Sequence, residues 1–285
     1  DGTFRPSAGQ PISVLNPATE EMIGEIAEAT PAEIEEAIEL ALAAQKAWWA
    51  RAAAERADIM HEVTRATREM RAVLAESLTR EQGKTYKEAM DEIGWCASAM
   101  SYYAEISRQE GGRVHGPSAP GQLHLTLKEP LGVVAAISPF NVPLLKNAKL
   151  TSTPLATGNT VVLLTSEEAP LIAHALADIY REAGLPEGAL NIVTGFGERI
   201  GDALTTHPLV KAVMFTGSSR VGRHIATLCG THMKRVILEL GGKSPMIVLA
   251  DADLEQAADA AAFSVFFFQG QACMGASRIF LQRAI

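Results

Sequence analysis

From Leu131 to Leu249 the chain alternates short apolar runs with helical segments, and this alternation limits its fold more than any other feature. The runs expected as strands are 132–137, 160–164, 190–193, 211–215, 236–240 and 246–249. The segments expected as helices are 169–183, 199–206 and 220–230. Continuous apolar strands alternating with helices are typical of a parallel sheet that is covered on both faces. The sequence therefore predicts an α/β fold with a Rossmann-like sheet.

The first 130 residues carry a different pattern. Thr30 is a candidate N-cap, Pro31 fits the first helical position and Glu33 completes a capping box, so a helix is expected to begin here. Further helices are expected at 54–81 and 84–106, and the segment before Pro17 is expected to be irregular except for a short strand near Val14. Residues 111–130 are rich in Gly and Pro and then alternate polar with apolar, which predicts a protruding β-hairpin.

The composition argues against several classes of protein. The net charge of -8 does not suit a general nucleic-acid surface. No apolar run approaches the length that crosses a bilayer, and the first residues carry no secretory signal pattern, so no membrane partner is expected. Three widely separated cysteines suit a reducing cytoplasm better than a disulfide framework. A chain of 285 residues can bury enough core to need no structural metal, and none is expected.

A turn of small residues follows the apolar run that ends at Phe215. Gly217 and Ser218 come directly before a helical segment, and Gly222 lies in its first turns. Small residues let the backbone approach a phosphate closely, and the free amides of a helix start attract anions. The Gly-x-x-x-x-Gly spacing is neither the usual dinucleotide fingerprint nor a P-loop. Alone it indicates a tight strand-to-helix turn; its place in an alternating α/β array favours a nucleotide.

Cys273 follows an apolar helical segment and lies in a bend that contains glycine. A lone cysteine is usually an inert core residue. We interpret Cys96 and Cys229 in this way, because the first lies within an expected helix and the second near a helix end. Cys273 differs from them through the polar residues that follow two of the apolar strands.

Those residues are Glu239 and Asn141, and strand ends are where α/β folds build their sites. Glu239 stands between an apolar strand and two glycines, so we expect a partly desolvated carboxylate whose raised pKa suits a general base. The alternative is a solvated strand-end acid. Asn141 offers an amide donor for a developing oxyanion. The alternative is a turn residue before Pro143.

Taken together, six segments resemble the aldehyde dehydrogenase superfamily over nearly the whole chain. They are Asn16-Pro17-Ala18-Thr19, Ser138-Pro139-Phe140-Asn141, Ala156-Thr157-Gly158-Asn159-Thr160-Val161-Val162, Phe215-Thr216-Gly217-Ser218, Glu239-Leu240-Gly241-Gly242-Lys243 and Gly270-Gln271-Ala272-Cys273. The Glu-Leu-Gly-Gly-Lys and Gly-Gln-x-Cys blocks are signatures of that family. The gap of 34 positions from Glu239 to Cys273 also agrees with it.

The resemblance implies an NAD(P)-dependent oxidation of an aldehyde to a carboxylic acid. It assigns Cys273 as the nucleophile that forms a thiohemiacetal and then a thioester. It assigns the Asn141 side chain and the Cys273 backbone amide to the oxyanion, and Glu239 to the water that releases the acid. Two rivals remain open: a CoA-acylating relative, against which Glu239 argues, and a truncated, non-catalytic nucleotide-binding module.

The resemblance also implies the cofactor contacts. Gly217 and Ser218 meet the pyrophosphate, and the other expected contacts are Ser138, Phe140, Glu167, Gly222 and Leu240. Leu164 stands where the family carries a lysine for the adenosine ribose, whereas Glu167 is kept. Because an acid accepts from ribose hydroxyls and repels a 2′-phosphate, NAD is expected rather than NADP.

Further departures concern the helix after Asn141 and the length of the chain. Leu150 stands where a lysine is frequent, with Lys149 one place earlier; this pattern, Phe140 and Thr153-Pro154-Leu155-Ala156 resemble the aromatic-aldehyde branch. The expected divisions are an N-terminal segment with helices (1–110), an oligomerisation hairpin (111–130), an NAD-binding core (131–241) and the start of a truncated catalytic domain (242–285). A full-length form is expected to be a cytoplasmic homodimer or homotetramer, and this chain alone is expected to show little activity.

Overall fold

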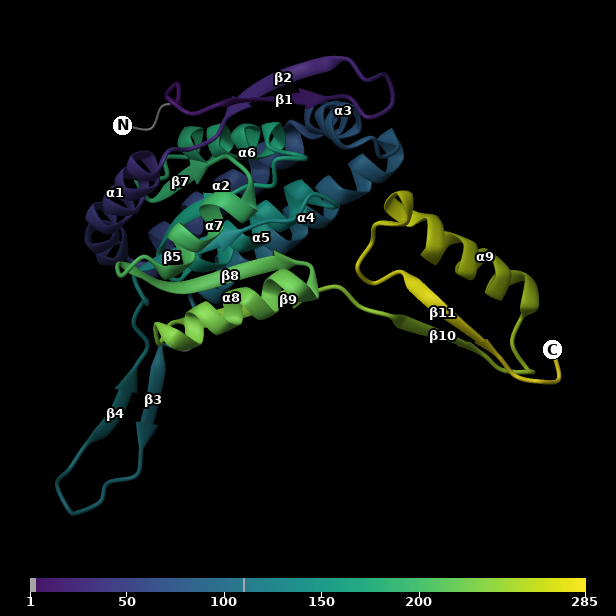
Figure 1. Ribbon diagram of the computed structural model, residues 1–285. Helices are drawn as coiled ribbons and strands as arrows, with labels where there is room; N and C mark the ends of the chain where they lie inside the picture. Colours follow the sequence, from purple (N-terminus) through teal and green to yellow (C-terminus); the bar gives the residue numbers. More distant parts are fainter. Residues whose placement is uncertain (1–3, 110) are drawn as a thin grey trace.

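A five-stranded parallel sheet lies at the centre of the computed structural model, which describes residues 4–109 and 111–285 (Figure 1). The strand order is β7-β6-β5-β8-β9, and every neighbouring pair is parallel. The strands are β5 (Val133–Ile137), β6 (Thr160–Leu164), β7 (Leu190–Val193), β8 (Val210–Gly217) and β9 (Arg235–Leu240). The predicted α/β fold with a parallel sheet is confirmed.

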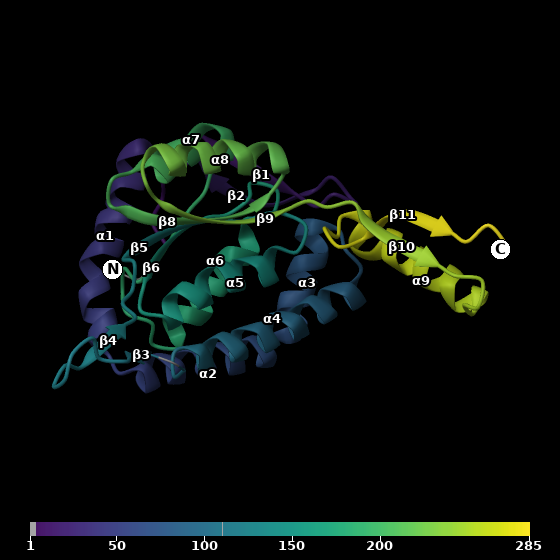
Figure 2. The ribbon, with the colours of Figure 1, turned by 90° about the horizontal axis from the view of Figure 1, so that it is seen from below.

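Helices cover both faces of this sheet (Figure 2). One face carries α1 (Pro31–Ala50), α7 (Gly197–Thr206) and α8 (Ser219–Thr231). The other face carries α5 (Pro143–Ala156) and α6 (Leu171–Glu182), with α2 (Ala53–Glu69), α3 (Arg71–Gln82) and α4 (Tyr86–Ile106) packed outside them. Every side chain of β5 and β6 is buried, because these inner strands are covered on both faces. Each buried Val, Leu or Ile side chain of these strands contributes about 1.5–3 kcal/mol on leaving water.

The start of the chain is more regular than the sequence suggested. β1 (Pro11–Leu15) pairs antiparallel with β2 (Met22–Ala27), so the prediction of an irregular segment with one short strand missed β2. The turn between them is closed by Asn16, whose side chain accepts from the Ala18 amide at 2.9 Å. The capping box of α1 is present as predicted, because Thr30 and Glu33 each accept from the other's backbone amide.

The single helix predicted at 54–81 is wrong, since two helices, α2 and α3, meet at Met70. No glycine or proline marks this break in the sequence, so local propensity could not locate it. The break follows from tertiary contacts instead. The Arg71 guanidinium donates to the Met90 carbonyl at 2.9 Å and holds the start of α3 against α4. The Thr67 hydroxyl donates to the Val63 carbonyl, a contact that bends helices.

Two units project from the body (Figure 1). The predicted hairpin is formed by β3 (Gly112–His115) and β4 (His124–Leu127). The C-terminal unit contains β10 (Ser244–Val248), α9 (Leu254–Phe266), the short helix η1 (Phe267–Gly270) and β11 (Ala276–Leu281). The apolar run at 246–249 was expected in the main sheet; it lies in β10, which pairs with β11 and with no other strand among the described residues. The Gly241-Gly242-Lys243 link leads the chain away from β9, which stays an edge strand.

Helix α5 was not predicted, because Pro154 and the run Thr151-Ser152-Thr153 weaken its helical pattern. Its first turn has no side-chain cap of its own. The Glu92 carboxylate of α4 supplies one by accepting from the Leu145 amide at 3.1 Å. Buried carboxylates therefore stabilise helix starts from outside the helix.

Glu81 of α3 does the same for α6. Its carboxylate accepts from the amides of Leu171 and Ile172, the second at 3.0 Å, and only 2% of the residue is exposed. Burial raises the pKa of Glu81 to about 7, although the two amides favour its charged form. The group therefore takes up a proton at a higher pH in the folded chain than in the unfolded chain.

This shift gives Glu81 a pH-dependent effect on stability. As pH rises from the ordinary glutamate value of 4.5 to about 7, the unfolded state loses its proton first, so the free energy of unfolding falls across that window. Gln cannot ionise, so its stability does not fall in this way. The free energy of unfolding of Glu81→Gln should therefore rise relative to that of the wild type by up to about 3 kcal/mol between these pH values. Urea unfolding at several pH values measures the difference, with the exposed Glu76→Gln of the same helix as control. A difference independent of pH would contradict the assignment.

Candidate active site

The carboxyl ends of β5 and β8 mark the point where the sheet changes direction. The chain builds β6 and β7 to one side of β5, and β8 and β9 to the other. Ile137 pairs with Phe215, so Ser138 and Thr216 follow side by side on the two strands. Both are buried, and neither hydroxyl has a protein partner among the described residues. Open α/β sheets bind ligands at such a switch point, and unpaired buried hydroxyls favour a ligand that can bond to them.

The small-residue turn begins on β8 and runs into α8. Ser218 caps α8 by accepting from the Val221 amide at 3.3 Å. A Cβ at Gly217 would come within 2.4 Å of the Phe215 ring, and one at Gly222 within 2.4 Å of a Leu240 methyl. Gly222 thus lets α8 lie directly on the end of β9. Amides at a helix start favour an anion, and the pyrophosphate contact expected at this turn stays a prediction.

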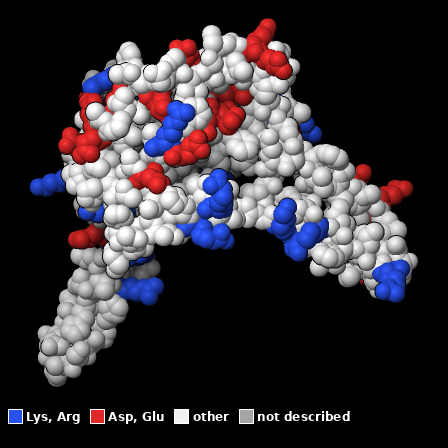
Figure 3. Space-filling model, viewed as in Figure 1, with Lys and Arg blue, Asp and Glu red and all other residues white. Residues whose placement is uncertain are grey.

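Two other predicted cofactor residues lie along the same edge. Glu167 is half-buried in the turn after β6, and Phe140, 42% exposed, lies in the turn before α5. Leu164, at the end of β6, is buried. Figure 3 shows basic side chains over the start of α8 and the link to β10, segments that carry Arg220, Arg223 and Lys243. Positive charge beside the turn favours an anionic cofactor. The residues present therefore fit a dinucleotide.

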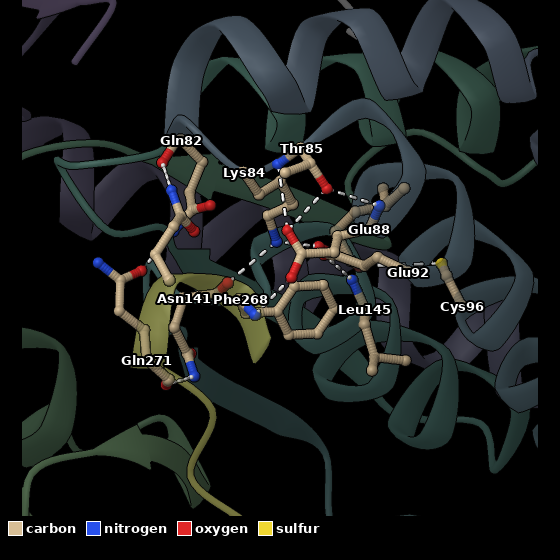
Figure 4. Close-up of polar contacts among 12 residues, drawn as sticks. Gln82, Lys84, Thr85, Glu88, Glu92, Cys96, Asn141, Leu145, Phe268 and Gln271 are labelled. Carbon is tan, nitrogen blue, oxygen red and sulfur yellow. Dashed lines mark hydrogen bonds and ion pairs between the residues drawn. The ribbon is translucent and has the colours of Figure 1, made fainter. Parts of the chain in front are cut away.

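Cys273 lies in the bend between η1 and β11 and is exposed. The Asn141 side-chain amide donates to the carbonyl of Gln271 in this bend at 2.8 Å (Figure 4). A Cβ at Gly242 would lie 3.5 Å from the Cys273 carbonyl oxygen, so the link after β9 passes beside the same bend. The structure therefore brings the predicted nucleophile, the predicted oxyanion donor and the glycine link together.

The expectation of a desolvated Glu239 carboxylate is wrong for this chain, since 61% of the side chain is exposed. The reason is its place on β9, the edge strand of the sheet, whose side chains alternate between exposed and half-buried. The partner of Glu239 is Lys146 of α5, whose Nζ lies 3.6 Å from the carboxylate. The Lys146 side chain is only 10% exposed, so a largely buried ammonium group lies beside an exposed carboxylate.

Lys146 was missed by the sequence reasoning, which weighed only Lys149 and Leu150. Leu150 is buried, and Lys146 precedes it by one helical turn on the same face of α5. The spacing of four residues between Lys146 and Leu150 could have pointed to Lys146. It indicates a shared face only within a helix, and α5 was not predicted. Gln271 was missed as well. Its contact with Asn141 is made by the backbone carbonyl, which every residue type has, so the sequence cannot indicate it.

The other two cysteines have the structural setting that was predicted. Cys96 lies in α4 and Cys229 in α8, and both are fully buried. Burial raises the pKa of both thiols, which keeps them protonated and unreactive. Nothing in the described segments forms a bilayer-spanning helix, and no cluster of three metal-ligating side chains occurs there.

Comparison with known proteins extends these observations. The model of the aldehyde dehydrogenase family matches residues 4–285. The chain is 38% identical to the NADP(+) succinate-semialdehyde dehydrogenase GabD of Escherichia coli strain K12 over 281 residues, which cover 97% of the chain and 58% of that protein. It is 39% identical to a glutarate-semialdehyde dehydrogenase of Pseudomonas putida, with the same coverages. The chain thus spans somewhat over half the length of these relatives.

Solved structures agree with these relatives. An aldehyde dehydrogenase of Brucella melitensis biovar abortus 2308 has a TM-score of 0.96 and 37% identity, covering 99% of this chain and 59% of that one. A betaine aldehyde dehydrogenase of Staphylococcus aureus, solved in complex with NAD+, has a TM-score of 0.97 and 33% identity, covering 100% of this chain and 57% of that one.

The exposure of the three thiols leads to a direct test. Cys273 should be the first to react with limiting iodoacetamide at neutral pH, because the reagent reaches it while Cys96 and Cys229 are buried. Peptide mapping by mass spectrometry locates the adducts, and a urea-unfolded sample, in which all three thiols label, is the control. Earlier labelling of Cys96 or Cys229 would show that the folded chain differs from the structure described here.

Proposed function

The chain belongs to the aldehyde dehydrogenase family, and we propose that the native protein oxidises an aldehyde to a carboxylic acid with NAD(P). The observation that carries the proposal is the approach of the Asn141 amide to the bend that holds Cys273, with 2.8 Å to the Gln271 carbonyl. An exposed thiol can attack a carbonyl carbon, and an amide donor close to it can stabilise the oxyanion that develops.

In this proposal, the Cys273 thiolate attacks the aldehyde carbon and forms a thiohemiacetal. The negative charge that develops on the aldehyde oxygen is held by the Asn141 side-chain amide and the Cys273 backbone amide. Loss of hydride leaves a thioester on Cys273, and bound NAD(P) would accept that hydride. When substrate binds, the Asn141 amide would exchange its bond to the Gln271 carbonyl for one to the aldehyde oxygen.

Glu239 is the proposed base for hydrolysis of the thioester. Its exposure gives it access to water, and Lys146 holds its carboxylate at the end of β9. A CoA-acylating enzyme would have less use for a base at this position. We therefore favour release of a free acid over transfer to CoA.

The proposed cofactor contacts follow the edge from β6 to β9. Gly217 and Ser218 face the pyrophosphate, with Ser138, Phe140, Gly222 and Leu240 around them, and Glu167 is proposed to accept from the adenosine ribose. A carboxylate in this position disfavours a 2′-phosphate, which supports NAD. The E. coli relative carries NADP(+) in its name, so NADP is the alternative that must be tested.

The proposed divisions of the chain are those expected from the sequence, with the sheet at 131–241 as the cofactor-binding core and 242–285 as the start of a catalytic domain. The exposed apolar side chains of the β3–β4 hairpin, Val114, Leu125 and Leu127, support a role in subunit contact. We propose a homodimer or homotetramer. The aldehyde itself is assigned only by class.

A kinetic experiment on the native protein tests this function. Glu239→Gln keeps the size of the side chain but removes the proton acceptor, so hydride transfer should proceed and thioester release should slow by about 100-fold or more. Stopped flow should show a burst of NAD(P)H followed by slow turnover, with a panel of semialdehydes and aromatic aldehydes as substrates. Glu182→Gln, exposed at the far end of α6, is the matched control and should turn over normally.

Run with both cofactors, this assay also tests the cofactor proposal, and NAD should saturate the burst at the lower concentration. If NADP saturates the burst at a lower concentration than NAD, a basic residue near the ribose must outweigh the effect of Glu167. Loss of the burst together with turnover would remove Glu239 from the hydrolytic step. No activity in wild-type native protein with any aldehyde would contradict the proposed function itself.

A further inference from the structure

A buried ion pair lies beneath the candidate active site and has no part in the chemistry proposed above. Lys84 precedes α4 and Glu92 lies within it; both side chains are 0% exposed, and they contact one another (Figure 4). Taking two charges out of water is costly, so a buried pair of this kind is weak evidence for stability. Its other contacts show what it does.

Lys84 uses its ammonium group in three directions. One is the Glu92 carboxylate, the second is the backbone carbonyl of Asn141 at 3.0 Å, and the third is the face of the Phe268 ring, whose centre lies 4.3 Å away. An ammonium has three protons to donate, so all of its capacity is used. One side chain thus contacts the loop of the oxyanion donor and the turn ahead of Cys273.

That turn needs support because its backbone is strained. Phe268 and Gln269 have φ values of 48° and 56°, and Gly270 follows with 74°. Left-handed conformations at non-glycine residues each cost of order 1–3 kcal/mol and persist where neighbours hold them. The neighbours here belong to the start of α4 and the end of α3.

Three further hydrogen bonds connect this turn to α3 and α4. Glu88 accepts from the Phe268 amide at 2.7 Å. The Gln269 side chain donates to the Gln82 carbonyl at 3.1 Å, and the Gln82 side chain donates to Gln271 at 2.6 Å. The Glu92 carboxylate meanwhile caps α5 at Leu145, close behind the Asn141 loop.

We propose that Lys84, neutralised by Glu92, is a positioning residue that sets the placement of the Asn141 amide relative to Cys273. It acts on Asn141 through the backbone carbonyl and on the cysteine bend through the Phe268 ring. The assignment rests on the proposed function, because it gives Asn141 and Cys273 their roles. The geometry of the pair is independent of that function, so its test has an arm that needs no catalysis.

The test must separate positioning from stability. Lys84→Met removes the contacts to Asn141 and Phe268 but leaves Glu92 as a lone buried charge, which destabilises the chain. The double variant Lys84→Met with Glu92→Gln removes both charges and keeps an amide oxygen to cap α5. It should recover most of the stability of the wild type, as measured by urea unfolding. Its remaining defect then reports on position alone.

Lys234→Met is the matched control. Lys234 is a half-buried lysine that donates to two backbone carbonyls, those of Thr205 at 2.8 Å and of His207. It precedes β9 and so lies at the amino edge of the sheet, away from the site. The variant Lys234→Met should lower the free energy of unfolding without changing the hydrogen exchange of residues 267–275.

The arm that needs no catalysis is hydrogen exchange in the 285-residue chain. Exchange of residues 267–275 should be about tenfold faster in both Lys84 variants, the effect of losing one ordinary hydrogen bond, with β5 and β6 unchanged in the double variant. The catalytic arm is the burst rate in the native protein. It should fall by about 100-fold in the double variant, with the Kd for cofactor unchanged.

The outcomes are distinguishable. If the double variant recovers stability, exchange and burst rate together, Lys84 has only a structural role and the proposal is wrong. It is equally wrong if Lys234→Met slows the burst as much as the Lys84 variants do. If the wild type shows no burst, the proposed function fails, and the exchange data alone decide whether Lys84 holds the bend.

Discussion

The order of the strands in the parallel sheet is the constraint on which the rest of this structure depends. The chain adds β6 and β7 on one side of β5, and β8 and β9 on the other. β5 and β8 are neighbours, and the helices that follow them, α5 and α8, lie on opposite faces of the sheet beyond Ile137 and Phe215. Ser138 and Thr216 lie at these strand ends with buried hydroxyls that have no partner among the described residues, and the Gly217–Ser218 turn follows β8. The Asn141 loop and the link after β9 begin from the same edge. The site is thus a consequence of strand order.

Strand order alone does not hold loops in place, and the outer helices supply that control. Glu81 and Glu92 reach inward from α3 and α4 to cap α6 and α5, and Lys84 reaches the Asn141 carbonyl. Burial raises the pKa of Glu92 and lowers that of Lys84, while their mutual attraction opposes both shifts. Burying these charges is unfavourable, and the hydrogen bonds that they make, which no apolar side chain could make, offset part of that cost.

The sequence predicted the sheet well, because fully covered strands must be continuously apolar and five such runs lie between helical segments. Through the family resemblance it assigned Asn141 and Cys273 to one site, and the Asn141 side chain does contact the bend that holds Cys273. It failed where tertiary contacts overrode local propensity, as at Met70 and in α5. It also failed for Glu239, whose exposure depends on β9 remaining an edge strand. Lys84 could not be found, because its partner Asn141 lies 57 positions away along the chain. Lys146 lies one helical turn before Leu150, but this spacing had meaning only once α5 was known, and its partner Glu239 lies 93 positions away.

A crystal structure of the native protein with the preferred dinucleotide bound and Cys273 replaced by Ala is the most direct test of this account. The pyrophosphate should lie at the Gly217–Ser218 turn, between the ends of β5 and β8, with hydrogen bonds to Ser138 or Thr216. The Asn141 amide and residue 273 should lie on the same side of the nicotinamide. A dinucleotide bound elsewhere, for example in the groove between α1, α6 and β7, would contradict this account.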